Sequence, residues 1–348
     1  MKIFTLKMTL NTMFFTDLAL SSSWRKLRAE SCTLRERGLS NGTWANRVSH
    51  LRAYVSFTVY YGVEDFPIHL GVLLRYIALL ARGPYAYGSA ANMLGILRWF
   101  TKLLDPDSEK IFESVLVSSS LRGLKAQLSR PLRQKLPFSV SHLAKFYGLL
   151  DLKDVKQLAG WCAMLLAFFG CFRLSNLVSS SKGSFDPLKH LVRGDIKSEG
   201  KFLLIFYKWS KTNQSADKVA WIPIHSVSDD RFNVKLHLKT LFSVVKASRD
   251  APLFTFSKSG FHSRSSLVRI LDQCVDKAGL SVGDYSWHSF RRGAAVFAFE
   301  LGLDDSAVQL LGDWSSDAFK HYLEFAFVRK AAVAEKVSKS FEVYIEKL

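Results

Sequence analysis

The chain has 348 residues, 48% of them hydrophobic, which is enough for packed cores and favours two domains over one. Lys and Arg number 48 against 30 Asp and Glu, and the resulting net charge of +18 predicts a polyanionic partner. Nucleic acid is the leading candidate, and an acidic membrane surface is the alternative. The longest apolar run, residues 161–172, suits a buried helix better than a membrane span, so we expect no membrane partner.

Cysteine spacing and the first residues narrow the class further. The four cysteines show no paired C-x-x-C spacing, so we predict neither a metal site nor a disulfide framework, and a reducing compartment follows. Residues 1–24 contain charged side chains, no continuous apolar core and no small-residue cleavage site. We therefore expect a flexible N-terminus there rather than a signal peptide.

Residues 25–118 are predicted to form a helical bundle that binds DNA. A capping sequence at residues 40–43 is followed by a hydrophobic stripe at helical spacing, made of Val48, Leu51, Val55 and Val59. Arg47 and Arg52 fall on other faces of that helix and are candidate DNA contacts. Similar periodicity predicts helices over about 68–82 and 89–104, with another over about 108–118, and no alternating strand pattern interrupts them.

Residues 119–138 have the features of an exposed, basic linker between two domains. No Asp or Glu occurs between Ser114 and Leu150, and Pro131 and Pro137 punctuate the segment. Its candidate DNA contacts are Arg122, Lys125, Arg130, Arg133 and Lys135. Because the halves on either side are both positively charged, we expect a clamp around a duplex rather than a single basic tail.

Residues 139–348 are predicted to form a mainly α domain of the α+β class. Helices are expected over about 140–151 and 153–170, and helical periodicity returns from residue 263. Between them, apolar strands at 202–207 and 219–224 flank a polar turn at 210–214. Turn residues between two β-rich runs favour a hairpin, hence a small antiparallel sheet.

The candidate chemistry begins with His288 and Arg291. They stand three residues apart, so on a helix both can address one phosphate. Tyr322 follows after the sequence Leu-Gly-Asp-Trp at 311–314, and a tyrosine hydroxyl becomes a useful nucleophile where cations stabilise the charge on the phosphate. Taken singly, His288 could be a core histidine and Tyr322 an ordinary residue of an amphipathic helix.

Two upstream cations fit the same reaction. Arg173 directly follows the apolar run at 161–172, which would deliver its charge to a buried region, and guanidinium groups bind phosphate oxygens bidentately. Lys211 lies in the predicted hairpin turn and could protonate a leaving oxygen. Lys208 competes for that role, and we favour Lys211 because a turn gives it the freedom to reach outward.

The ordered set Arg173, Lys211, His288, Arg291 and Tyr322 resembles the tyrosine recombinase (phage integrase) family over nearly the whole chain after Ser23. The sequences at 209–212 and 311–317 look most like recombinases of eukaryotic mobile elements, the DIRS-like retrotransposons and Cryptons. The resemblance implies a core-binding domain at 25–118 and a catalytic domain at 139–348. For that branch it implies a nuclear location, and otherwise the cytoplasm or nucleoid.

The resemblance also implies a transesterification that needs no metal, cofactor or ATP. Tyr322 would attack the scissile phosphate, leaving a 3′-phosphotyrosyl bond and a free 5′-hydroxyl, while Arg173, Arg291 and His288 hold the phosphate. His288 would take the tyrosine proton, and Lys211 would protonate the leaving oxygen. The implied partner is double-stranded DNA, bound by a homotetramer on paired sites.

Two positions depart from the family pattern. Asp313 stands where the family usually has His or Trp, and a carboxylate near a phosphate would repel it, so we expect Trp314 to take the supporting role. Asn176 replaces a common acidic residue three positions after Arg173. Neither change removes a reactive group.

Alternatives remain for the C-terminus and for the function. The last predicted helix carries an apolar stripe that packs on its own domain or docks on a neighbouring protomer, made of Val333, Val337, Phe341 and Ile345. Besides an active recombinase, the chain could be a recombinase-derived protein that binds DNA without cutting. It could also be a type IB topoisomerase, which shares the chemistry.

Overall fold

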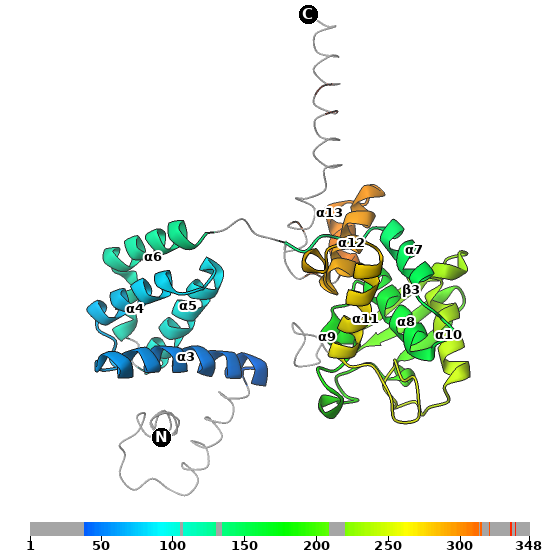
Figure 1. Cartoon of the computed structure of the whole chain (residues 1–348), viewed down its shortest axis with the longest axis horizontal. Helices are drawn as coiled ribbons and strands as arrows, with labels where there is room; N and C mark the ends of the chain where they lie inside the picture. The colour runs from blue at the N-terminus through cyan, green and yellow to red at the C-terminus, as the bar shows by residue number, and fades with distance from the viewer. Residues whose placement is uncertain are drawn as a thin grey trace, which may run out of the picture. The chain divides into compact units, whose positions relative to one another are not determined.

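The computed structural model divides into two compact units, Met1–Leu132 and Arg133–Leu348, shown in Figure 1. The structure describes residues 38–104, 107–129, 134–208, 220–312, 314, 320, 335 and 338. The expected flexible N-terminus at 1–24 lies outside them. None of the helices in these ranges is long and apolar enough to cross a membrane.

Unit 1 is helical, as predicted. The Ser40 hydroxyl caps the first helix by accepting from the Thr43 N–H at 3.2 Å, and Gly62 ends it in the left-handed conformation with φ 64°. Tyr54 is fully buried at the centre and donates its hydroxyl proton to the Asp65 carbonyl at 3.1 Å. The elements are α3 (Asn41–Tyr61), α4 (Leu70–Arg82), α5 (Tyr87–Leu104), the 3₁₀ helix η1 (Asp107–Glu113) and α6 (Val115–Leu128).

The prediction of an exposed linker over 119–138 is wrong for both of its described parts, because residues 119–128 lie in α6 and residues 134–138 pack on unit 2 with Phe138 fully buried. Helix α6 runs from Val115 to Leu128, packs on α4, and buries Val117, Leu124 and Leu128 in the core of unit 1. Its apolar residues recur at helical spacing, while Arg122 and Lys125 occupy the exposed face. The basic residues are therefore the solvated side of a packed helix, and the helix that the sequence predicted over 108–118 is η1 followed by the start of α6.

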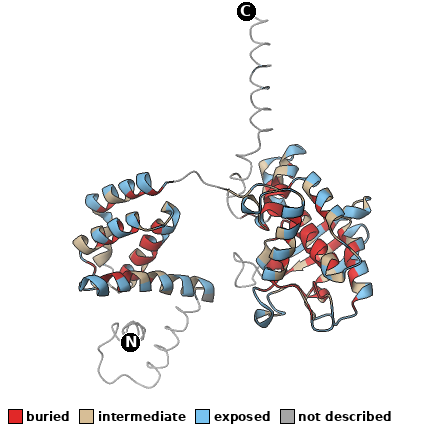
Figure 2. Cartoon of the chain, in the orientation of Figure 1, coloured by how far each residue is buried: buried red, intermediate tan, exposed pale blue. Residues whose placement is uncertain are grey.

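Unit 2 is built around α8 (Val155–Phe169), whose residues from Leu158 to Phe168 are all buried (Figure 2). Asp154 caps it by accepting from the Lys156 N–H at 2.9 Å. Two neighbours, α10 (Val234–Val244) and α12 (His288–Glu300), pack directly on it. The remaining helices are α7 (Val140–Leu149), α9 (Leu174–Leu177), α11 (Arg264–Lys277) and α13 (Asp305–Leu311), with 3₁₀ helices η2 (Lys182–Ser184), η3 (Arg193–Asp195), η4 (Asp230–Phe232) and η5 (Val282–Asp284).

The predicted antiparallel sheet is confirmed, with one strand that the sequence did not predict. β2 (Phe202–Tyr207) pairs on one side with β3 (Ala220–His225), in the register Ile205 to Ile222. On its other side it pairs with β1 (Ile196–Glu199), which is short and polar and therefore lacks the alternation of a half-buried strand. The fold is mainly helical with a small three-stranded sheet, as expected. The turn predicted at 210–214 lies outside the described residues.

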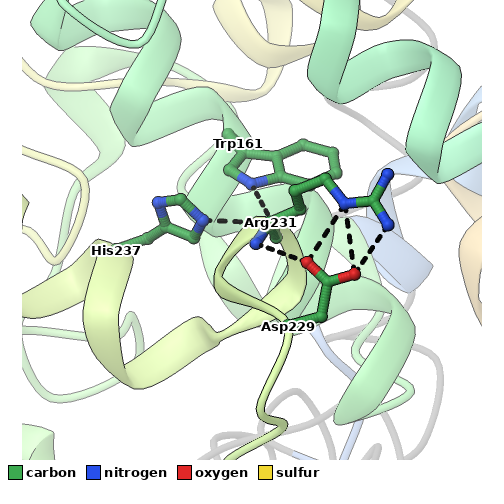
Figure 3. Close-up of polar contacts among 4 residues, drawn as sticks. All are labelled: Trp161, Asp229, Arg231 and His237. Atoms are coloured by element: carbon green, nitrogen blue, oxygen red, sulfur yellow. Dashed lines mark hydrogen bonds and ion pairs between the residues drawn. The ribbon is translucent and has the colours of Figure 1, made fainter.

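One backbone carbonyl ties the turn before α10 to the central helix (Figure 3). The Arg231 carbonyl accepts from Trp161 Nε1 on α8 at 3.0 Å and from His237 Nε2 on α10 at 3.1 Å. The Arg231 guanidinium pairs with Asp229 at 2.7 Å on the outside of the turn. These bonds help to hold α8 in place, and α8 leads directly into the segment that carries Arg173.

Candidate active site

Arg173 reaches the site through a tight turn at the end of α8. Gly170 ends the helix, and a Cβ there would lie 2.4 Å from the Phe172 ring, so only glycine fits. Arg173 then precedes α9, where Asn176 Oδ1 accepts from the Arg173 N–H at 3.1 Å. Asn176 therefore supports the backbone of Arg173. The guanidinium of Arg173 is half-buried and makes no hydrogen bond or ion pair within the part of the chain that the structure describes.

Cys171 has the one left-handed backbone among the described non-glycine residues, with φ 50°. Its carbonyl accepts a hydrogen bond from Arg291 Nη1, on a helix 120 positions further along the chain. Complete burial raises the pKa of the Cys171 thiol to about 12, so it stays protonated and unreactive. No sequence pattern marks Cys171, because a positive φ at a cysteine depends on the folded chain and not on neighbouring residue types. Its role is to join the Arg173 segment to Arg291.

Arg291 is 3% exposed and is fixed on three sides. Besides the Cys171 carbonyl, its Nη2 donates to the Gly312 carbonyl at 2.6 Å, and its guanidinium carbon lies 4.2 Å from the centre of the Trp314 ring. A buried guanidinium held this way needs no reorganisation to receive an anion.

Trp314 is buried against Arg291 by a local turn. The backbone N–H of Trp314 donates to the Gln309 carbonyl at 3.1 Å, and Gln309 Nε2 donates to the Trp314 carbonyl at 2.9 Å. A Cβ at Gly312 would lie 1.9 Å from the Trp314 ring, so glycine at 312 makes room for the indole.

His288 begins α12, one turn before Arg291, and keeps part of its surface open to solvent while protein atoms surround the rest. Its pKa is lowered to about 4, first by the loss of surrounding water and then by the positive charges of Arg291, Arg292 and Arg173. The imidazole is therefore neutral at pH 7 and able to accept a proton. Because Arg173 acts on His288 together with two arginines of α12, the fold brings the predicted upstream and downstream cations to one place.

Several solved structures share this architecture. A Tn1549 transposon integrase in complex with transposon right end DNA matches with a TM-score of 0.59 and 13% identity, covering 88% of this chain and 98% of that one. The XerH site-specific recombinase bound to its difH substrate matches at 0.57 and 16%, covering 80% and 76%. A lambda integrase dimer bound to a COC′ core site matches at 0.50 and 16%, covering 87% and 94%. By sequence, no protein-family model and no curated protein matches the chain.

The fold is that of the tyrosine recombinases. At these identities the likeness concerns the fold alone, so the individual residues of the site rest on the geometry described above.

Lys208, the competitor of Lys211, is committed elsewhere in this recombinase fold. Its ammonium lies 2.7 Å from Asp195 Oδ2 and donates to the Pro187 carbonyl at 2.6 Å, and both charged side chains are largely buried. A lysine held in a buried ion pair is poorly suited to reaching a leaving oxygen. This arrangement favours Lys211, which itself lies outside the described residues and stays a prediction.

Tyr322 and Asp313 also lie outside the described residues, so their roles stay predictions. The described residue nearest to Tyr322 in the sequence is Lys320, whose Nζ lies 3.8 Å from Asp305 Oδ2 at the start of α13. The geometry thus joins Arg173, His288, Arg291 and Trp314 and leaves the nucleophile to experiment.

The candidate DNA contacts differ in how accessible they are. Arg52, Arg122 and Lys125 are exposed, while Arg47 is half-buried with its guanidinium 3.9 Å from the Trp99 ring centre. Lys135 Nζ donates a hydrogen bond to the Gly283 carbonyl at 2.6 Å, so this lysine already has a partner within unit 2. The other two predicted contacts, Arg130 and Arg133, lie outside the described residues.

Proposed function

We propose that this chain is a site-specific DNA recombinase that cleaves and rejoins DNA through a 3′-phosphotyrosyl intermediate. The observation that carries the proposal is the convergence of Arg173, Arg291 and a neutral His288. Two guanidinium groups and a proton acceptor match what a phosphodiester needs during attack by a hydroxyl group. The similar structures bound to DNA, and the positive charge of both halves of the chain, support DNA as the substrate.

In the proposed reaction, the Tyr322 oxygen attacks the phosphorus and the bond to the 5′-oxygen breaks. The tyrosine proton passes to His288, whose low pKa keeps it neutral and able to accept it. Lys211 gives a proton to the departing 5′-oxygen. Arg173 and Arg291 neutralise the non-bridging oxygens, so their charges take the part that a metal ion would take in a metal-dependent nuclease. Rejoining reverses these steps with a new 5′-hydroxyl.

The partners follow from this chemistry. Recombination needs two DNA sites, so we propose a homotetramer on paired sites, in which the C-terminal stripe at 333–345 docks on a neighbouring protomer. This stripe lies outside the described residues. The likeness of the sequences at 209–212 and 311–317 to those of eukaryotic mobile elements supports a DIRS-like or Crypton-like origin and hence a nuclear location.

The decisive experiment is incubation with nicked duplex DNA in EDTA, followed by denaturing gel analysis of covalent adducts. Wild type should form adducts, and Tyr322→Phe should form none, because the substitution removes only the attacking oxygen. Adducts that persist in Tyr322→Phe would eliminate this nucleophile. Loss of all adducts in EDTA would contradict the metal-free mechanism.

The same assay separates the alternatives. Tight binding with no adduct under any condition would favour a DNA-binding protein derived from a recombinase. Relaxation of supercoiled DNA without pairing of two sites would favour a topoisomerase. Equal adduct formation by Lys211→Ala and wild type would remove Lys211 from the acid role.

A further inference from the structure

Residues 134–138, here called the connector segment, begin the described part of unit 2 and lie across the start of α12. The Leu136 N–H donates to the Asp284 carbonyl at 2.8 Å, and the Phe138 N–H donates to the Ser289 carbonyl at 3.0 Å. At Gly293 a Cβ would lie 1.9 Å from the Phe138 carbonyl oxygen. The connector backbone therefore touches the helix backbone directly, and only glycine at 293 permits it.

Phe138 anchors the far end of this segment. It is fully buried and stacks on the Tyr285 ring, with centroids 4.8 Å apart and planes at 5°, and it also packs on Phe290. Tyr285 lies three residues before His288. The anchor thus lies next to the turn that carries the candidate catalytic histidine.

Arg292 holds the near end. It is 6% exposed, its Nη1 donates to the Lys135 carbonyl, and its Nη2 donates to the Gln134 side-chain oxygen. On a helix, neighbouring side chains point about 100° apart. Arg291 and Arg292 accordingly hold different segments, the first the carbonyls of Cys171 and Gly312 and the second the connector.

We propose that Arg292 is a positioning residue that ties the connector segment to the turn of α12 bearing His288 and Arg291. The connector segment, at the start of unit 2, is then a structural part of the candidate active site. The catalytic consequence rests on the function proposed above, whereas the tie itself does not. A displacement of Gln134 or Lys135 would therefore reach that turn through Arg292.

The test compares Arg292→Gln with a matched control elsewhere in unit 2. Arg193 is 8% exposed and donates its Nη1 and Nη2 to the carbonyls of Val245 and Thr255, so Arg193→Gln loses a similar pair of buried bonds. Arg292→Lys keeps the charge but loses the two-pronged geometry. The measurements are amide hydrogen exchange over residues 134–138 and 286–292, and single-turnover cleavage of nicked DNA at saturating protein.

Arg292→Gln and Arg292→Lys should raise exchange in both segments by at least about tenfold, whereas Arg193→Gln should leave both at the wild-type rate. Cleavage should fall on the order of 10- to 100-fold in the Arg292 variants, because a misplaced phosphate site slows the chemical step, while the DNA dissociation constant stays within about threefold. Unchanged exchange in the Arg292 variants would overturn the tie.

Faster exchange with cleavage no lower than in Arg193→Gln would overturn the positioning role. If wild type cleaves no DNA, the proposed function fails, and exchange at 286–292 still decides whether Arg292 positions this turn.

Discussion

Two regions in the described part of unit 2 bury positive charge, and the groups around that charge differ. In the first, Arg193 donates to two backbone carbonyls, and Asp195 pairs with Lys208 at 2.7 Å while accepting from the Val192 N–H at 2.8 Å. Here a carboxylate offsets a buried ammonium. In the second, the three charged groups that lower the pKa of His288 are all arginines.

The difference indicates that the second region, rather than the first, can receive an anionic ligand. A buried cation and the carboxylate beside it form a pair with little net charge, so the pair contributes to the structure rather than to ligand binding. In the second region the positive charges of three arginines lower the pKa of His288, and the same charges would attract a phosphate. A phosphodiester would bring negative charge to these arginines, so substitutions in the two regions should have different consequences.

The largest effect is expected at Arg173. Arg173→Ala should lower the rate of adduct formation on the order of 10²- to 10³-fold, because one guanidinium facing the phosphate is lost. Its thermal midpoint should stay near that of wild type, since the Arg173 side chain makes no hydrogen bond or ion pair within the described part of the chain, and its backbone bonds remain in alanine.

Arg269→Ala is the matched control, because it removes the same charge from an exposed position on α11. Equal loss of activity in both variants would mean that only overall charge matters. A large loss of stability in Arg173→Ala would place that arginine with the structural group.

The second effect concerns the balanced region. Asp195→Asn should lower the free energy of unfolding by about 3 kcal/mol, because Lys208 would keep its buried charge without the carboxylate. Chemical denaturation measures this. Asp229→Asn breaks an exposed pair with Arg231 and should change stability little. Similar values for the two variants would remove the distinction between the pairs.

Much of the fold follows from local pattern. The helix expected over about 153–170 is α8, Val155–Phe169, within two residues at each end, and the apolar residues at 202–207 predicted β2. Where charge and spacing conflicted, spacing was the better guide, since α6 packs through Val117, Leu124 and Leu128 despite its basic residues. Strand β1 is formed by pairing with β2, which no local pattern records.

The candidate site was predictable in part. The order and spacing of Arg173, His288 and Arg291 indicated a phosphate site, and the structure brings these residues together. The spacing from His288 indicated Arg291, but no sequence pattern assigned a role to Arg292, because its partners are the Lys135 carbonyl and the Gln134 side chain, 157 and 158 positions away. For the same reason the left-handed Cys171 could not be predicted, since its conformation depends on contacts made by the folded chain.

The smallest effect compares two histidines whose pKa values are both about 4, His288 and His262. His262 is buried, and its bonds are within the fold: Nε2 donates to the Lys156 carbonyl at 2.9 Å, and Nδ1 accepts from Ser266 Oγ at 2.7 Å. NMR titration with a short duplex should raise the pKa of His288 by about one unit, because the phosphate offsets the arginines. That of His262 should not move. Equal shifts, or none at His288, would contradict an anion site there.

The lowered pKa of His262 also determines how the free energy of unfolding depends on pH. Below the ordinary histidine pKa of 6.5 the unfolded chain binds a proton at residue 262, while the folded chain does so only near pH 4. The contribution of neutral His262 to the free energy of unfolding is therefore fully present above pH 6.5. It falls as the pH drops towards 4, by up to about 3 kcal/mol for this buried group. His262→Gln should flatten that fall in chemical denaturation between pH 7 and 4.5. Duplex DNA should stabilise the wild type at low pH, because His288 has a higher pKa in the DNA complex and binds its proton more tightly there.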